Sequence, residues 1–278
     1  MGKAYVFQDK FEDASQVLDE VINSGQYTLM SNYEVIFEHE GENGSESVFE
    51  VQYTDAEGAS FDCFQCSEGN IAVGFNGIRQ YNGPVFDSGF SFNVPTQEAV
   101  DAFETGDLRK DIAILDIARW ASQRGATYGR GYEHTGYFNR KYIARKGDSN
   151  IGDQNLTNPN NYRALRYADV LLLAAEANAR KASPDENKAR NYLNLVRQRA
   201  FGTTSRAITA TGSALQDAIF DERRVEFVGE GHRFFDLVRT GRAAQEIDGF
   251  TPNKNELFPV PFEEIQFSNG NWMQNNGY

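Results

Sequence analysis

The sequence predicts a mainly α-helical protein in which helical hairpins adjoin a loop-rich, irregular half with a few short strands. Two observations support this fold class. Near the start of the chain and throughout its last third, apolar residues recur at the three- and four-residue spacing of a helix. Residues 54–94 and 119–145 instead mix glycine with polar and aromatic residues and show no sustained period, as loops do.

The first predicted helix covers residues 8–24, and Gly25 stands where a left-handed residue would end it. The apolar residues that carry its helical spacing are Phe11, Ala14, Val17, Leu18, Val21 and Ile22. Residues 47–53 alternate apolar with polar side chains and therefore predict a strand.

The middle of the chain begins with residues 54–94, which we interpret as a long ordered loop. A loop of this length inside a compact domain is unusual and favours a functional role. Thr96 is placed to cap a short helix that runs through Phe103 and ends by Gly106.

The last third predicts three helices. Residues 162–181 are apolar nearly all round, so this helix is expected to be buried on most sides. Ser183 begins a capping box with Pro184 at the first helical position, which opens a second helix. These two helices and their turn form one tetratricopeptide-like hairpin, and a third helix is expected over residues 213–228. The chain shows no clean self-repeat.

The composition argues against several classes of function. The 278 residues suffice for one large domain or two smaller ones, and a hydrophobic fraction of 40% fits a globular protein. The net charge of −13 argues against nucleic acid as a partner and weakly disfavours strongly anionic glycans. The longest apolar run, residues 170–175, is far shorter than the ~18 residues of a membrane span.

Cys63 and Cys66 form a Cys-x-x-Cys within a segment that is typical of a loop. A thioredoxin-like site needs a strand-to-helix context, and zinc needs two more ligands that the three histidines do not supply at paired spacing. A local disulfide or a pair of free thiols is favoured over incidental metal binding or redox chemistry. No EF-hand spacing supports a calcium site. We assign no cofactor, no metal site and no catalytic residue.

Three carboxylates, Glu222, Glu226 and Glu230, are spaced four residues apart, which would place them on one helix face. A glycosidase needs carboxylates on opposite sides of a bond, whereas residues on one face point the same way. With Arg223 and Arg224 nearby, structural ion pairs are favoured. His232 with Asp236 is interpreted as structural too, because no hydrolase elbow or metalloprotease motif accompanies the pair.

The stretch 119–145 interleaves aromatic residues with glycine and is the best candidate binding region. Sugar rings pack their C–H faces on aromatic rings, while their hydroxyls need amide or charged partners. The alternative is that these aromatic residues fill the core of a loop-rich subdomain. The candidate glycan-binding residues are Trp120, Tyr128, Tyr132, Tyr137, Asn139 and Arg140.

The order of several segments in the last third resembles the SusD/RagB family, whose members are glycan-binding lipoproteins of the outer membrane of Bacteroidota. These segments are 161–172, Glu222-Arg223-Arg224, Gly231-His232-Arg233, 257–265 and 274–278, with Asp107-Leu108-Arg109 upstream. The resemblance implies a tetratricopeptide scaffold with a loop-rich half that carries the glycan site. It covers 1–278 unevenly: a hairpin remnant and strand at 3–53, the glycan-binding region at 54–160 and the signature region at 161–278.

The resemblance also implies a function without catalysis: binding of oligosaccharide or polysaccharide at the cell surface and its delivery to a SusC-like TonB-dependent transporter. Family members have an N-terminal lipidated cysteine and further helical hairpins, neither of which occurs here. We therefore expect a C-terminal fragment or an atypically short member, with Met1-Gly2 as the start of a truncated protein. The alternatives are a protein-interaction module without glycan contact and, less favoured, a glycoside hydrolase.

Overall fold

The computed structural model describes residues 1–63, 66–131, 133–148, 152–153 and 155–278. The chain divides into two compact units, Met1–Gly229 and Glu230–Tyr278, called unit 1 and unit 2 below. The mainly α-helical fold class is confirmed, because helices are the dominant regular structure and the strands are short.

Unit 1 contains most of the regular structure. In chain order its elements are α1 (Gly2–Val6), α2 (Phe11–Asn23), η1 (Val35–Phe37), η2 (His39–Gly41), β1 (Ser47–Val51), α3 (Ala72–Asn76), β2 (Ile78–Arg79), β3 (Ser88–Gly89), α4 (Gln97–Asp101), α5 (Lys110–Ala113), β4 (Ile114–Asp116), α6 (Ile117–Arg124), β5 (Tyr137–Asn139), η4 (Arg140–Tyr142), β6 (Tyr162–Arg166), α7 (Tyr167–Arg180), α8 (Glu186–Phe201), η5 (Thr204–Arg206) and α9 (Gly212–Glu226).

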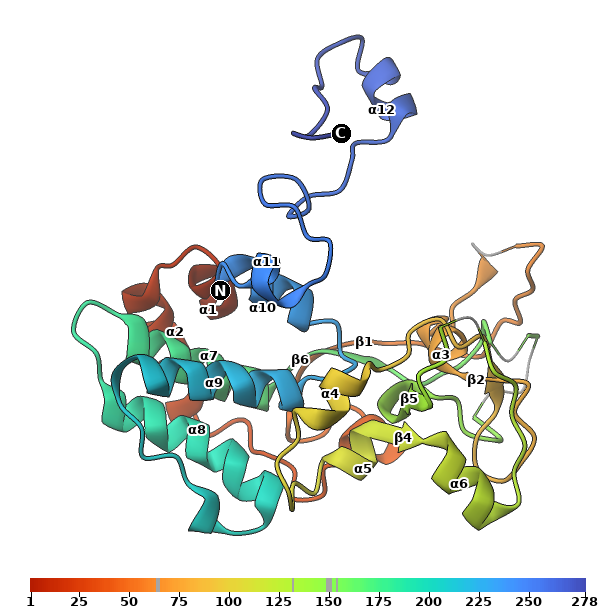
Figure 1. Cartoon of the computed structure of the whole chain (residues 1–278), viewed down its shortest axis with the longest axis horizontal. Coiled ribbons are helices and arrows are strands. Elements are labelled where there is room, and N and C mark those ends of the chain that lie inside the picture. The colour runs from red at the N-terminus through yellow and green to blue at the C-terminus, as the bar shows by residue number, and fades with distance from the viewer. Residues whose placement is uncertain (64–65, 132, 149–151, 154) are drawn as a thin grey trace. The chain divides into compact units, whose positions relative to one another are not determined.

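One side of unit 1 is a layer of packed helices in which α7 contacts α2, α8 and α9 (Figure 1). Nearly every side chain of α7 is buried, as its apolar sequence predicts. Leu171, Leu172 and Leu173 are fully inaccessible, and burying each of them stabilises the fold by about 1.5–3 kcal/mol. The strongly amphipathic α2 covers α7 with Ala14 and Leu18.

The predicted boundaries were wrong at the start of two helices. The helix expected from residue 162 begins at Tyr167, because Tyr162–Arg166 forms β6 and pairs antiparallel with β1. The capping box expected at Ser183 does not form. Instead, the Asp185 carboxylate accepts a hydrogen bond from the Lys188 backbone N–H at 3.0 Å, so Asp185 is the N-cap of α8.

The third helix, α9, begins at Gly212 and ends at Glu226. Glu230 therefore lies outside the helix, and the expectation that Glu222, Glu226 and Glu230 share one helix face was wrong for the third carboxylate. The short helix predicted after Thr96 is confirmed as α4, with the Thr96 hydroxyl accepting from the Ala99 N–H at 3.3 Å.

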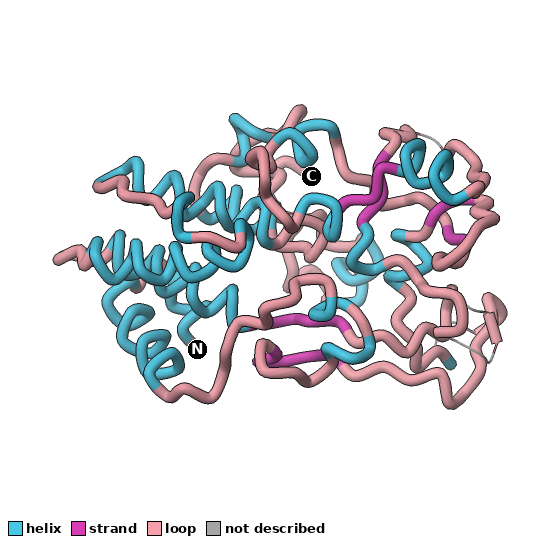
Figure 2. Tube along the Cα trace, turned by 90° about the horizontal axis from the view of Figure 1, so that it is seen from below, coloured by secondary structure: helices cyan, strands magenta, loops and turns pink. Residues whose placement is uncertain are grey.

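The other side of unit 1 consists of loops, short strands and short helices, a division that Figure 2 shows from below. β4 pairs antiparallel with β5, and β2 pairs parallel with β3. The helix α6 was not predicted, although its sequence has a capping residue at the start and a glycine at the end. Asp116 caps its first turn by accepting from the Arg119 N–H at 3.0 Å, and Gly125 ends it with a φ of +65°.

A buried network of ion pairs joins the loops to the helical layer. Glu226 at the end of α9 accepts from Arg166 of β6 at 2.6 Å, from Arg199 of α8 at 2.5 Å and from Arg109 at 2.8 Å. Arg109 also forms ion pairs with Asp107 and with Glu222, each at 2.6 Å. The structural interpretation of Glu222 and Glu226 is therefore supported, although their partners come mostly from outside α9.

Unit 2 contains α10 (Arg233–Arg239), α11 (Ala243–Glu246) and α12 (Phe262–Phe267). Within α10, Asp236 forms an ion pair with Arg239 at 2.7 Å. The Gln274 side chain bonds both the N–H and the carbonyl of Val260, at 2.7 and 2.9 Å, which ties the terminal segment to the loop before α12. Across the described part of the chain, no helix combines the length and the apolar character needed to cross a membrane.

Candidate functional site

Trp120 is a structural member of the loop-rich half. It lies on α6, half-buried against a core of Ile78, Tyr81 and Phe86, with its ring centroid 4.9 Å from that of Phe86. Its indole N–H donates to the Tyr81 hydroxyl at 2.9 Å, and Tyr81 in turn donates to the carbonyl of Pro84 at 2.7 Å. The indole N–H is therefore already used within the protein.

The two described tyrosines of the candidate set are also half-buried. Tyr128 packs on the same core as Trp120 and lies 5.8 Å from the ring of His134. Burial, and secondarily the positive charge of Arg130, lower the pKa of His134. Tyr137 packs against a separate apolar cluster at the end of β4. Tyr132 lies outside the described residues.

Asn139 and Arg140 follow each other at the end of β5 but have different surroundings. Asn139 is buried, donates to the Gly229 carbonyl at 2.8 Å and accepts from the Lys141 N–H at 3.2 Å. Arg140 is half-buried and forms an ion pair with Glu34. Arg140 also lines a surface hollow.

This hollow has a volume of about 830 Å³. It is lined by Glu34, Val35, Glu38, Glu40, Val85, Phe86, Arg140, Arg145 and Lys146. Two of its carboxylates are occupied, because Glu34 pairs with Arg140 and Glu38 pairs with Arg145 at 2.6 Å. A glycoside hydrolase needs two opposed carboxylates at the bond it cleaves, and carboxylates held by arginines do not favour that chemistry.

The structure reveals a second aromatic surface, which the sequence had not singled out. Phe61, Phe75, Phe90 and Phe92 form a contiguous group, called the phenylalanine platform below. Phe75, Phe90 and Phe92 lie at the corners of a triangle with centroid separations of 5.8–6.0 Å, and Phe61 contacts Phe90 at 6.1 Å. The exposed fractions are 66% for Phe92, 51% for Phe61 and 37% for Phe75.

Backbone pairing holds three of the four rings of the platform. The Phe90 N–H donates to the Gly74 carbonyl and the Phe92 N–H donates to the Phe75 carbonyl, both at 2.9 Å. The same two stretches of backbone approach each other very closely between α3 and β2. A Cβ on Gly89 would lie 2.4 Å from the Gly77 Cα, a contact with backbone that no side-chain movement relieves.

Arg79 forms the polar edge of the platform. Its guanidinium carbon lies 5.9 Å from the centroid of the Phe92 ring, and Nη2 donates to the Phe90 carbonyl at 2.7 Å. Among the described residues, Nε has no hydrogen-bond partner. A Cβ on Gly131 would lie 3.2 Å from this Nε, so the absence of a side chain lets the Gly131 backbone pack closely against the guanidinium.

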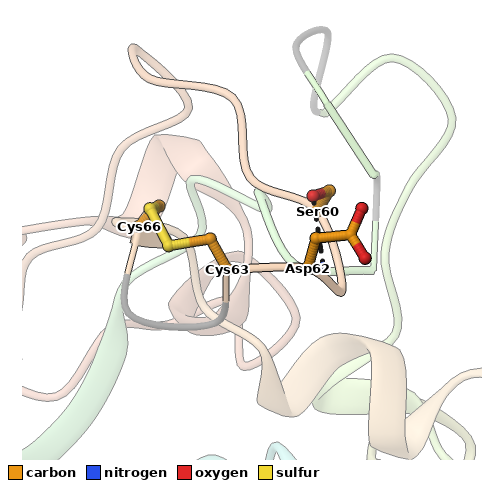
Figure 3. The surroundings of a disulfide bond; sticks show 4 residues. All are labelled: Ser60, Asp62, Cys63 and Cys66. Carbon is orange, nitrogen blue, oxygen red and sulfur yellow. Dashed lines mark hydrogen bonds between the residues drawn. A yellow bond between two sulfur atoms is a disulfide. The ribbon is translucent and has the colours of Figure 1, made fainter.

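Cys63 and Cys66 form a disulfide with Cα atoms 5.4 Å apart, which is one of the two states that the sequence favoured (Figure 3). The bridge begins two residues after Phe61. The Ser60 hydroxyl accepts from the Asp62 N–H at 3.3 Å and so forms a second local constraint beside Phe61. Both contacts restrict the backbone next to this ring of the platform.

The sequence signal for the platform was weak. Its members stand 14, 15 and 2 residues apart, at no regular spacing, in the region predicted as a long loop. Richness in phenylalanine without a helical or strand period was the available hint. The local composition of residues 119–145 favoured that stretch instead, and its described aromatic residues turned out to be half-buried.

Comparison with known proteins finds relatives that match nearly the whole chain. A solved laminarin binding SusD-like protein is 36% identical, with a TM-score of 0.87, and the match covers 100% of this chain and 61% of that one. Surface glycan-binding protein A from Bacteroides thetaiotaomicron, solved in complex with laminarihexaose, is 30% identical with a TM-score of 0.84, covering 99% of this chain and 62% of that one.

A curated relative, SusD-like protein P38 of Formosa agariphila, is 27% identical over 95% of this chain and 56% of its own length. The chain thus spans between half and two thirds of the length of these relatives. The sequence profile described as the SusD family matches residues 117–278. This match covers more than half of the chain and contains α6 to α12. The chain therefore belongs to the SusD family.

Proposed function

We propose that this chain binds an uncharged oligosaccharide of the laminarin type, a β-linked glucan, without cleaving it. The observation that carries the proposal is the match of the whole chain, at 36% identity and a TM-score of 0.87, to a protein named for binding laminarin. The surface glycan-binding protein solved with laminarihexaose supports the same ligand class.

The chemistry of the chain supports a neutral ligand. The net charge of −13 repels anionic polysaccharides at long range, whereas an uncharged glucan is indifferent to it. Exposed aromatic rings and a nearby guanidinium provide the two kinds of contact that a sugar needs, one for its C–H face and one for its hydroxyls.

The loop-rich half of unit 1 is the proposed binding region. Direct sugar contact by Trp120, Tyr128, Tyr132, Tyr137 and Asn139 stays a prediction. The contacts of Trp120 and Asn139 favour a supporting role, since both donate hydrogen bonds within the protein. Arg140 lines the surface hollow and is proposed to hydrogen-bond a hydroxyl of the glucan there.

The proposed setting is the outer face of the outer membrane. There, a protein anchored by an N-terminal lipid would deliver glycan to a SusC-like TonB-dependent transporter. This part of the proposal rests on family membership. A protein-interaction module without glycan contact is the competing function, and it predicts transporter binding with no affinity for sugar.

Isothermal titration of the chain with laminarihexaose tests the proposal, with an alginate oligosaccharide of equal length as the charged comparison. We expect saturable binding of the glucan, weaker binding of the alginate, and a hexasaccharide recovered intact by chromatography after prolonged incubation. Absence of binding to any β-glucan, or release of shorter sugars, would contradict it.

A further inference from the structure

We propose that the phenylalanine platform is the surface on which pyranose rings of the glucan stack, and that Arg79 hydrogen-bonds the hydroxyls of the stacked sugar. The inference deepens the proposed function and rests on it, because it assigns the bound glucan to one surface. It also assigns the contact to residues outside the aromatic–glycine stretch at 119–145.

Three of the four rings of the platform are exposed to solvent. A phenylalanine ring forms no hydrogen bonds with water, so a contiguous group in which Phe61, Phe75 and Phe92 are exposed is unfavourable unless a ligand or partner covers it. Phe92, the most exposed, is in contact with both Phe75 and Phe90 at interplanar angles of 27° and 25°. These are stacked contacts between rings 5.8–5.9 Å apart, and the exposed side of Phe92 is the apolar surface that we assign to a sugar ring.

The rings are also held rigidly. The platform does not depend on flexible side chains alone, because backbone hydrogen bonds from Phe90 and Phe92 fix their positions against α3. Between them, Ser91 is buried with a φ of +59°, a conformation that non-glycine residues adopt rarely. Its hydroxyl accepts from the Arg79 N–H at 2.9 Å. A surface fixed before binding loses less conformational entropy when the ligand arrives.

The platform also has a polar edge. The guanidinium of Arg79 is held by one hydrogen bond to the Phe90 carbonyl, while its Nε has no partner among the described residues. Nε itself is buried beside Gly131, but Arg79 as a whole is half-buried, so a sugar hydroxyl would meet the outer guanidinium nitrogens next to the Phe92 ring. An arginine beside aromatic rings therefore completes a site for a molecule with an apolar face and hydroxyl edges.

The same features argue against a lipid surface as the occupant. Binding to anionic lipid depends on clusters of lysine and arginine, whereas the platform consists of uncharged phenylalanine rings with Arg79 beside Phe92. The chain also carries a net charge of −13. Relatives matched over the full length of this chain include one solved with laminarihexaose, which favours a glucan over a protein partner.

The test is a titration of laminarihexaose into the full chain and four variants. Phe92→Ala removes the most exposed ring of the platform, and we expect about tenfold weaker binding or more, a change of about 1.4 kcal/mol. Phe92→Trp keeps an aromatic face and should bind within about threefold of the parent. Phe49→Ala is the matched control, because Phe49 on β1 is 61% exposed and does not belong to the platform.

Parent-like binding by Phe92→Ala and by a second variant, Arg79→Gln, would overturn the platform while leaving the proposed function intact. No glucan binding by the parent chain would overturn both. Near-ultraviolet circular dichroism of each variant establishes folding; if Phe92→Ala were misfolded, Phe61→Ala would replace it. The parent chain could instead self-associate and bind no glucan. If Phe92→Ala abolished that self-association, the platform would be a contact between two copies of the chain, and the inference would be refuted.

Discussion

Replacing Glu226 with glutamine removes the negative charge on which three buried arginine side chains converge. Arg109, Arg166 and Arg199 reach its two carboxylate oxygens at 2.5–2.8 Å, and Glu226 is fully buried. Glutamine keeps the shape of the side chain, so the substitution changes the charge and the hydrogen bonding with little change in packing.

The size of the expected stability loss depends on which carboxylate partners each arginine keeps in Glu226→Gln. Arg166 and Arg199 still pair with Glu46, at 2.9 and 2.7 Å, and Arg109 still pairs with Asp107. Removing one partner of a buried ion pair costs about 3–5 kcal/mol, and retained partners place Glu226→Gln near the lower end. A loss of about 3 kcal/mol lowers the melting temperature of a unit of this size by roughly 6–12 °C.

The same site predicts a pH dependence. Burial alone would raise the pKa of Glu226, but the charges of Arg199, Arg166 and Arg109 outweigh it and hold the pKa below its ordinary value of 4.5. The unfolded chain therefore takes up a proton near pH 4.5 while the folded chain does not. The stability that Glu226 contributes is fully present above that pH and is lost progressively as the pH falls below it.

Urea denaturation followed by circular dichroism, at neutral pH and near pH 3, measures both effects. The matched control is Asp111→Asn, which removes a charge from the exposed Asp111–Arg119 pair and should cost under about 1 kcal/mol. A Glu226→Gln variant as stable as the control at neutral pH would refute the reasoning, and so would a stability difference that grows in acid.

Three further predictions concern the binding region. Arg140→Ala should weaken laminarihexaose binding roughly tenfold, since a hydrogen bond from a charged donor contributes about 1.5–3 kcal/mol; unchanged titration would remove Arg140 from the site. Gly89→Ala should separate β2 from β3, because the new Cβ meets the Gly77 backbone. We expect a stability loss of about 1–3 kcal/mol in thermal melts, together with weaker glucan binding. A melting temperature equal to that of the parent would contradict this close contact. Reducing the Cys63–Cys66 disulfide should cost at most about 2 kcal/mol, because the closed loop is short, and should weaken binding by releasing one edge of the platform. If reductant also lowered the stability or the glucan binding of a Cys63→Ser, Cys66→Ser double variant, the effect on the parent would not come from this disulfide.

The helical layer was predictable because its signals are local. The buried α7 follows from an apolar surface on all sides, and Gly25 has the positive φ expected where the first helix ends. The start of α7 was not predictable in this way. Tyr162–Arg166 continues the helical spacing, but pairing with β1, more than 100 residues earlier in the chain, makes it a strand.

The candidate site was harder to predict for the same reason. Local composition identified 119–145, yet the core around Ile78 half-buries Trp120 and Tyr128. Three rings of the phenylalanine platform come from separate loop segments and one comes from α3, and backbone hydrogen bonds between residues about 16 positions apart hold Phe90 and Phe92 beside Phe75, beyond the reach of a local sequence pattern. Family resemblance correctly identified the fold and the ligand class of relatives without locating this surface.

The most direct test of the account is a crystal structure of the chain with laminarihexaose bound. The account predicts a glucose ring stacked over Phe92 and its neighbours in the phenylalanine platform, with a hydroxyl within hydrogen-bond distance of Arg79. A hexasaccharide bound elsewhere in unit 1, with the platform empty, would contradict it.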